Sequence, residues 1–285
     1  MIRDASKLRA EAEKLAGFLP GVLLEARKLA AAAPGVHGRR RAGPGEAFWQ
    51  FRDHRPEDGA KLVDWRRSAR GDRLFVRERE KEAAQTALFW IDPDAGFDWS
   101  SDGAWPTKKR RALSICLALS ILFTRAGERV GVLGGAPPRT GARAVDRIAE
   151  ELARARIVKP PTPASRCAVI YASDFYASPD DWRDRLAAAS SAGATGALLM
   201  IADPAEEDFP FRGRTLFEEP GGAKRSALFG RAEAARNEYA QRLAAHRAAM
   251  REVAAAHGFI AVLHRTDRSA APTLSMLVSA LGERR

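Results

Sequence analysis

The feature that most constrains the fold is an alternation of short apolar runs with helical patterns from residue 86 onward. Five runs rich in aliphatic and β-branched residues lie at 86–91, 129–133, 167–172, 196–201 and 259–263. Patterns typical of helices lie between them at 107–125, 142–155, 180–192 and 228–257, and another follows at 272–281. Because parallel strands need crossover connections, this order predicts an α/β fold with a doubly wound, mostly parallel sheet covered on both faces.

Two shorter segments precede this pattern and differ from it. Residues 3–16 and 21–33 have the spacing of two short helices, interrupted by Gly17, Pro20 and Gly21. Residues 36–85 are rich in aromatic residues and arginine and contain short β-like runs. We therefore expect three parts: an N-terminal helical segment (1–35), a small β-rich Arg/Trp module (36–85) and a main α/β domain (86–285).

The formal net charge of +11 and the pI near 10.2 raise the question of nucleic-acid binding. Residues 1–85 hold 19 Lys+Arg against 13 Asp+Glu, and the rest holds 28 against 23, so the excess is spread along the chain. An electrostatic footprint needs basic residues gathered on one face. The only dense run, Arg39 to Arg41, is typical of a solvated loop, so nucleic-acid binding stays a second alternative.

Nothing in the sequence indicates a membrane span or a secretory leader. The longest apolar run, 112–123, is shorter than the roughly 20 residues that a bilayer needs. The first residues alternate in charge and lack an apolar signal region. The two cysteines, Cys116 and Cys167, lie in apolar stretches, which predicts buried free thiols in a reducing compartment. We therefore expect a cytoplasmic protein.

Acidic residues follow two of the predicted strands. Asp92 and Asp94 come after the first run, and Asp174 comes after the third. Ligands of such sheets bind beyond the carboxyl ends of the strands, and carboxylate oxygens suit a hard cation such as Mg²⁺. The alternative is that these carboxylates cap helices or hold turns, and position in the sequence does not choose between the two.

Three elements stand in order in the Arg/Trp module: Arg52 to Asp58, Asp64 to Arg70 and Val76 to Glu78. They resemble the Arg-x-Tyr-x-x-Gly-Asp, Asp-Trp-Arg-x-Ser-Ala-Arg and Val-Arg-Glu elements of the family called domain of unknown function 58. His54 stands for the tyrosine and Glu57 for the glycine. The resemblance continues through Ser173-Asp174-Phe175 and covers most of residues 40–280.

Members of that family look like von Willebrand factor A domains, which often carry a metal-ion-dependent adhesion site. Its first loop reads Asp-x-Ser-x-Ser, and a threonine and an aspartate come from two later loops. The resemblance implies a Mg²⁺ site with Asp92 as the first aspartate, Asp174 as the late one and Thr140 as the threonine. The serine positions hold Asp94 and Gly96, so we expect a degenerate site that binds a cation differently or has lost it.

The Arg/Trp module has two interpretations. In the structural one, Trp49, Trp65 and Phe75 pack against the sheet domain, and arginines pair with aspartates inside the module. In the functional one, exposed Arg and Trp side chains form a docking surface for a partner. We favour the structural interpretation because such aromatics usually supply core. The charged residues concerned are Arg52, Arg66 and Arg70, with Asp53, Asp58 and Asp64.

These observations predict a protein-binding adaptor rather than an enzyme. Proteins that resemble this chain are often encoded beside MoxR-type AAA+ ATPases, which implies a link between such an ATPase and a client protein. The sequence lacks a phosphate-binding loop, a nucleophile elbow and zinc spacing of its histidines. The enzymatic alternative is a Mg²⁺-dependent phosphotransferase of the haloacid-dehalogenase type that uses Asp92 and Asp94.

Overall fold

The computed structural model describes residues 41–55, 63–69, 71, 73–81, 85–154, 156–218 and 226–283. The chain divides into two compact units between Ala84 and Gln85, and each is described by itself. The predicted helices at 3–16 and 21–33 lie outside the described residues. Arg41 is the first residue of a strand rather than part of a loop, and Arg39 and Arg40 are not described.

The small unit is a two-stranded antiparallel sheet with one short helix. Strand β1 (Arg41–Asp53) pairs with β2 (Phe75–Lys81), with register shifts in the first half of β1. Helix α3 (Trp65–Ser68) lies between them in sequence. Val63 forms a bridge with Val76, and both side chains are buried, so they supply the apolar centre of this unit.

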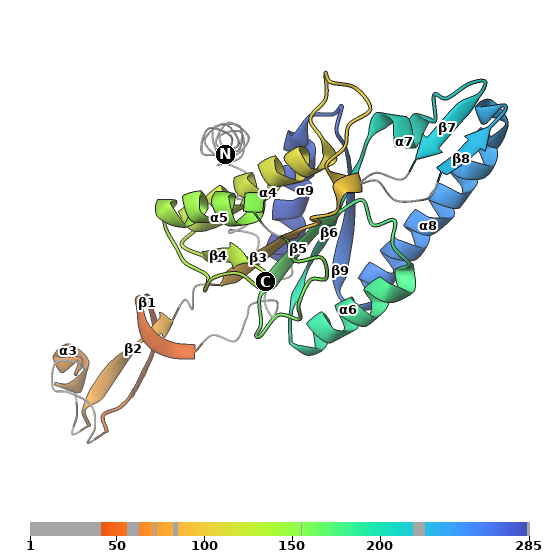
Figure 1. The fold of residues 1–285 in the computed structure, drawn as a ribbon. Helices are drawn as coiled ribbons and strands as arrows, with labels where there is room; N and C mark the ends of the chain where they lie inside the picture. Colours follow the sequence, from red (N-terminus) through yellow and green to blue (C-terminus); the bar gives the residue numbers. More distant parts are fainter. Residues whose placement is uncertain are drawn as a thin grey trace. The chain divides into compact units, whose positions relative to one another are not determined.

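The large unit is built on a sheet of five parallel strands (Figure 1), which confirms the predicted α/β class. The strands run in the order β4-β3-β5-β6-β9. In chain order this is 2-1-3-4-5, one of the two common doubly wound arrangements. Their bounds are β3 Thr86–Ile91, β4 Arg129–Val132, β5 Ala168–Ser173, β6 Thr195–Ala202 and β9 Phe259–Arg265.

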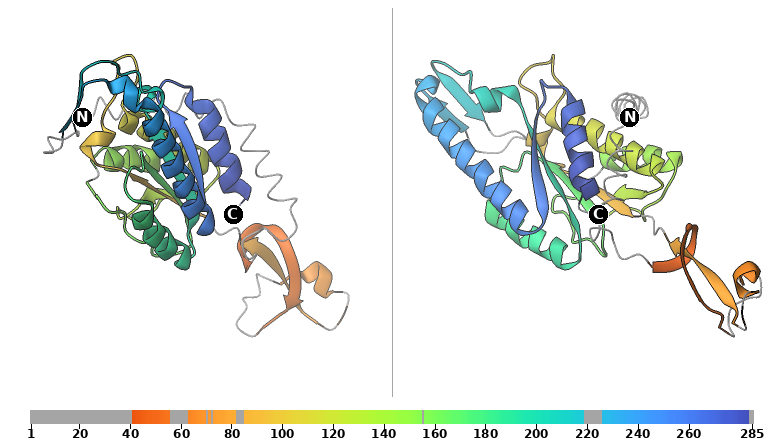
Figure 2. Two further views of the ribbon diagram at one scale, coloured as in Figure 1. Left: turned by 90° about the vertical axis from the view of Figure 1, so that its right-hand side faces the viewer. Right: turned by 180° about the vertical axis from the view of Figure 1, so that it is seen from behind.

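Helices cover both faces of this sheet (Figures 1 and 2). One face carries α4 (Lys108–Arg125), α5 (Ala142–Arg154) and α9 (Ala270–Glu283), and the other carries α6 (Pro179–Ser191) and α8 (Arg236–Ala256). Alternate residues of each strand enter the two cores. Phe89 and Ile170 face the first, and Trp90 and Tyr171 face the second. Continuous burial on both faces explains why these strands are unbroken apolar runs.

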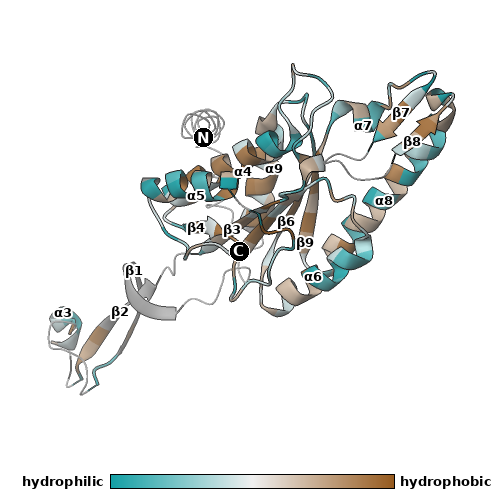
Figure 3. Ribbon diagram, in the orientation of Figure 1, coloured by the Kyte–Doolittle hydropathy of each residue, from teal (hydrophilic) through white to brown (hydrophobic). Residues whose placement is uncertain are grey.

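After its basic first turn, helix α4 is apolar on nearly every side, and Figure 3 colours much of it brown. It buries 13 of its 18 residues, including the free thiol of Cys116, because it lies between the sheet and the helices α5 and α9. Cys167, the other free cysteine, is half-buried. None of the described helices is long and apolar enough to cross a membrane.

The connection after β6 is more elaborate than the sequence predicts. It holds a short helix α7 (Pro204–Asp208), the strands β7 (Thr215–Glu218) and β8 (Ser226–Phe229) of an antiparallel ribbon, and a 3-10 turn at Ala232–Ala235. The predicted helix at 228–257 therefore begins only at Arg236. Phe217 and Phe229 meet edge to face across the ribbon, with ring centroids 5.5 Å apart. This pairing holds residues 226–229 in a strand.

Candidate functional site

The carboxyl ends of β3 and β5 meet at the point where the strand order of the sheet reverses. Asp92 follows β3 directly, Ser173 is the last residue of β5, and Asp174 comes next. The backbone N–H of Asp92 donates to the carbonyl of Ala172 at 2.9 Å, which extends the ladder by one bond. Ligands of doubly wound sheets bind at such switch points, so this is the first place to seek a site.

The Asp92 carboxylate is held by two hydrogen bonds. Its Oδ2 accepts from the Ser173 hydroxyl at 2.6 Å, and its Oδ1 accepts from the backbone N–H of Asp94 at 3.0 Å. Burial raises the pKa of Asp92 above its ordinary value, against the lowering by these two bonds, and the charges of Asp174 and Asp94 add to the rise. Asp94 turns its own carboxylate to the N–H of Gly96, at 2.7 Å, and caps a 3-10 turn (Ala95–Phe97).

A buried lysine lies in the same place. The Nζ of Lys108, the first residue of α4, donates to Asp174 Oδ2 at 2.9 Å and to Glu206 Oε1 at 2.6 Å. Only 2% of its side chain is exposed. Burial lowers the pKa of Lys108, but the charges of Asp174 and Glu206 outweigh it and raise the pKa above its ordinary value. The ammonium form is therefore held in the folded protein.

Asp203 is a further carboxylate that the sequence reasoning missed. It follows β6 and is fully buried. Its Oδ1 accepts from the N–H of Ala205, and its Oδ2 accepts from the N–H of Ser101, both at 2.9 Å. It thereby caps α7 and fixes the loop that precedes α4. The sequence pattern Asp-Pro-x-Glu after an apolar run is typical of a helix start and could have indicated this cap. In the structure, the side chain of Glu206 accepts a hydrogen bond from the N–H of Asp203, which completes a capping box.

Thr140 lies elsewhere in the sheet. Arg139 pairs antiparallel with Val130 at the edge, so Thr140 lies level with the start of β4. The first residue of β4, Arg129, pairs with Thr86. Thr86 lies six residues before Asp92, and six residues of extended strand span about 20 Å. The structure therefore brings Asp92, Asp94 and Asp174 to one edge of the sheet and places Thr140 toward the opposite edge.

Part of the Arg/Trp signature has roles inside the small unit. Asp64 caps α3 by accepting from the N–H of Arg67 at 3.0 Å. The hydroxyl of Ser68 donates to the carbonyl of Asp64 and accepts from the N–H of Phe75, both at 2.9 Å, and so ties α3 to β2. The guanidinium of Arg67 lies 4.3 Å from the ring centroid of Phe51. These contacts within the small unit involve Asp64, Arg67 and Ser68 but not the other described residues of the signature.

Several described residues of this signature are exposed, among them Trp65, Arg66 and Arg67, and 62% of Trp65 is accessible. Trp65 therefore supplies no core within its own unit. Asp53 lies 3.9 Å from Arg73, which was not among its predicted partners. The side chains of Trp49 and Arg52, and the residues Asp58 and Arg70, lie outside what the structure describes, so the other predicted pairs stay predictions.

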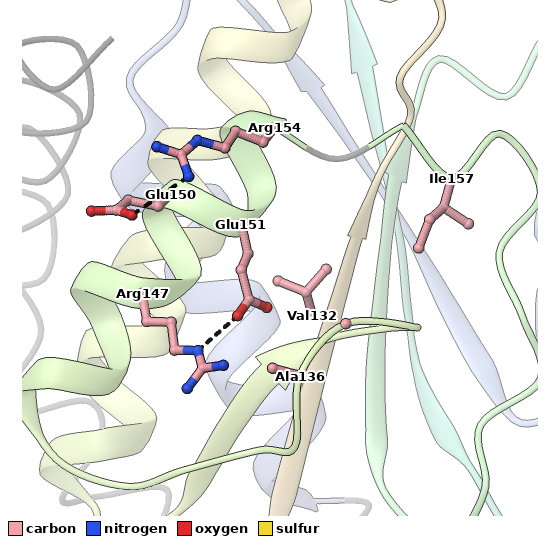
Figure 4. A pocket seen from close by; sticks show the side chains of 8 residues that line it. Val132, Ala136, Arg147, Glu150, Glu151, Arg154 and Ile157 are labelled. Atoms are coloured by element: carbon pink, nitrogen blue, oxygen red, sulfur yellow. Dashed lines mark hydrogen bonds and ion pairs between the residues drawn. The ribbon is translucent and has the colours of Figure 1, made fainter.

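A surface pocket of about 420 Å³ lies between β4 and α5 (Figure 4). Its charged residues pair with each other. Arg147 Nε donates to Glu151 at 2.8 Å, and Arg154 lies 4.0 Å from Glu150. We regard the edge at Asp92 as the stronger candidate site because it lies at the point where the strand order reverses.

The family described as "Protein of unknown function DUF58" matches residues 50–249, which include most of the small unit and the sheet as far as α8. The chain belongs to this family. The DUF58 match takes in Asp92, Lys108, Asp174 and Glu206, so the whole candidate site lies within the family region.

Other proteins resemble this DUF58 chain along nearly its whole length. The uncharacterized protein Rv1480 of Mycobacterium tuberculosis and the uncharacterized protein Mb1516 of Mycobacterium bovis are each 25% identical over 293 residues. These matches cover 94% of this chain and 90% of each relative. No solved structure matches it.

Proposed function

We propose that this chain is a protein-binding adaptor that contacts its partner through the loops beyond the carboxyl ends of its parallel strands. The partner implied by the family resemblance is a MoxR-type AAA+ ATPase, which the chain would link to a client protein during assembly or maturation. On this proposal the domain is similar to a von Willebrand factor A domain, and its doubly wound sheet supports that likeness.

The distribution of exposed apolar side chains carries the proposal. Seven large apolar side chains are exposed in the described part of the α/β unit, and five of them lie on connections beyond the carboxyl ends of strands. Tryptophan and tyrosine are among them, and these residues dominate the energetics of protein interfaces. The five are Trp105, Tyr176, Leu216, Leu228 and Phe229.

The β7–β8 ribbon contributes two of these exposed side chains as a pair. Leu216 and Leu228 are direct cross-strand partners, and both are exposed. The opposite face of the ribbon carries Phe217, whose ring packs against Phe209 and Phe211. The ribbon is thus fixed on one face by aromatic contacts and presents an apolar pair on the other.

The carboxylates at the switch point also favour binding over catalysis. Both oxygens of Asp92 accept hydrogen bonds from protein groups, and Asp94 faces Gly96 instead of the space beside Asp92. A phosphotransferase of the haloacid-dehalogenase type would need the second aspartate beside the reacting phosphate as an acid–base group.

Binding of the purified MoxR-type ATPase from the same genome tests the proposal. We expect the wild type to bind and the triple variant Trp105→Ala/Leu216→Ala/Leu228→Ala to bind at least about tenfold more weakly in interferometry. Met276→Ala, on the surface of α9, is the matched control and should bind as the wild type does.

Two results would overturn this proposal. One is equal binding by the triple variant and the wild type, which would move the contact away from this edge. The other is Mg²⁺-dependent hydrolysis of a phosphate ester that disappears in Asp92→Asn, which would establish the phosphotransferase instead.

A further inference from the structure

We propose that the ammonium group of Lys108 is the permanent internal cation of the switch-point site and takes the place that a divalent metal ion would have in an adhesion-type site. The inference does not depend on the adaptor function. It assigns a role to Lys108, which belongs to the basic run Lys108 to Arg111 and which no sequence pattern singles out.

The position of Lys108 is costly for a lysine, which points to a specific role. Residues at the N-terminus of a helix experience the positive end of the helix dipole, and a cation there is unfavourable. Lys108 is the first residue of α4, after the cap Thr107, and its side chain is almost completely buried. A buried ammonium needs carboxylates close by, and Asp174, directly after β5, and Glu206 of α7 supply them.

Aromatic rings complete the surroundings of the ammonium. Its Nζ lies 5.4 Å from the ring centroid of Tyr176 and 5.9 Å from that of Trp99. Ring faces attract a cation at such distances. The site therefore has the two kinds of group that stabilise a positive charge, carboxylates and aromatic faces, and the lysine already supplies that charge.

The carboxylate oxygens of Asp92, Asp174 and Glu206 are already engaged. Asp92 accepts from Ser173 and from the N–H of Asp94, through different oxygens. Asp174 Oδ1 accepts from the N–H of Tyr176 at 3.3 Å, and its Oδ2 accepts from Lys108. Glu206 Oε2 accepts from the N–H of Asp203 at 2.8 Å, and its Oε1 accepts from Lys108. All six oxygens therefore have a donor.

These residues do not fit a magnesium ion. Mg²⁺ requires near-octahedral oxygen ligands at about 2.1 Å, and the two hydroxyl positions of the adhesion pattern hold Asp94 and Gly96. A metal at Asp174 would also lie beside the ammonium that this carboxylate already pairs with. Within the described residues, no group of three or more His, Cys, Asp and Glu side chains is arranged to hold a metal ion.

Mn²⁺ is the probe for the first test, because its free form gives a strong electron paramagnetic resonance signal. Titration of the wild type at millimolar Mn²⁺ should show no saturable binding, and its thermal midpoint should be the same in EDTA, Mg²⁺ and Mn²⁺. Saturable binding that disappears in Asp92→Asn and in Asp174→Asn would overturn the proposal. This measurement uses the wild-type chain and does not depend on whether any lysine variant folds.

Replacement of the lysine is the second test. Lys108→Met keeps the length of the side chain but removes the charge, which leaves two carboxylates facing each other. We expect its folding equilibrium constant to fall by at least about 100-fold in urea unfolding. Lys109→Met, one residue along the same helix, is the control and should change it by less than about threefold. Equal effects of the two substitutions would contradict the internal-cation role.

Discussion

Arg265, the last residue of β9, holds Asp208, the last residue of α7, through two hydrogen bonds of 2.9 Å. Asp208 is the third of three consecutive carboxylates in α7. The other two, Glu206 and Glu207, pair with Lys108 of α4 and Arg247 of α8. This five-residue helix is thus attached to three elements by successive side chains, and it connects the switch-point site to the base of the β7–β8 ribbon.

The three pairs of α7 should differ in their effect on stability. Glu207 and Arg247 are largely buried, and the guanidinium Nη1 donates to Glu207 Oε2 at 2.7 Å, so Glu207→Ala leaves a buried charge without its partner. We expect a loss of about 3 kcal/mol in the free energy of unfolding, measured in urea. Asp208 is 59% exposed, and Asp208→Ala should cost less than about 1 kcal/mol.

The double variant Glu207→Ala/Arg247→Met checks the cause. Because it removes both charges, it should recover much of the loss seen with Glu207→Ala alone. A double variant that is as unstable as the sum of both single variants would mean that packing, not charge, decides the effect.

His264 should make stability depend on pH. Burial, with a smaller contribution from Arg111, lowers its pKa from 6.5 to about 4. The unfolded state therefore binds more protons between these values, so the contribution of His264 is complete above pH 6.5 and is lost as the pH falls toward 4. At pH 5 the loss is about 2 kcal/mol relative to pH 7.5.

Urea unfolding at pH 7.5 and pH 5 measures this effect by comparing the wild type with His264→Asn. Asparagine keeps a polar group near Thr273 Oγ1, which lies 2.9 Å from His264 Nδ1. The variant should lose less stability than the wild type between the two pH values. The same loss in both proteins would assign the pH dependence to other groups.

Two glycines should respond very differently to alanine. A Cβ on Gly196 would lie 1.8 Å from the carbonyl oxygen of Val169, in the neighbouring strand. We expect Gly196→Ala to cost more than about 3 kcal/mol, as a severe core disruption does. Gly127, which follows α4 at φ +80°, has open space around it, so Gly127→Ala should cost about 1 kcal/mol from its backbone conformation alone. Comparable losses in thermal unfolding would contradict the close approach at Gly196.

Ser68→Ala should loosen the small unit. It leaves the N–H of Phe75 without the hydroxyl that accepts its hydrogen bond at 2.9 Å, and the loss of such a half-buried hydrogen bond costs about 1 kcal/mol. We expect faster hydrogen exchange at the Phe75 amide, by about tenfold. Trp65→Ala is the control, since its exposed ring makes no contribution to this link. Unchanged exchange in Ser68→Ala would show that α3 is held to β2 by other contacts.

The sheet could be predicted from the sequence because its strands are buried on both faces. Runs such as Val169-Ile170-Tyr171-Ala172 leave no polar alternation, and a helical pattern follows each of them. Helix α7 and the β7–β8 ribbon escaped prediction because elements of four or five residues carry no period. Leu228 and Phe229 also continue the apolar spacing of α8, although cross-strand pairing decides their conformation.

The site was predictable only in part, for a related reason. Strand ends place Asp92 and Asp174 side by side in any parallel sheet with this strand order. Lys108 was missed because a run of four basic residues is normally a solvated face, and nothing local shows that one member turns inward. The misplacement of Thr140 follows from the antiparallel return at Arg139, which the sequence pattern does not reveal.

The burial of α4 on nearly every side has a consequence for how the chain is made. Its outer surface packs partly on α9, which is synthesised well over a hundred residues later. Until then a nascent chain carries a finished apolar helix with no complete cover, a surface of the kind that chaperones bind. The architecture that hides this helix in the mature protein therefore leaves part of it uncovered until α9 has been synthesised.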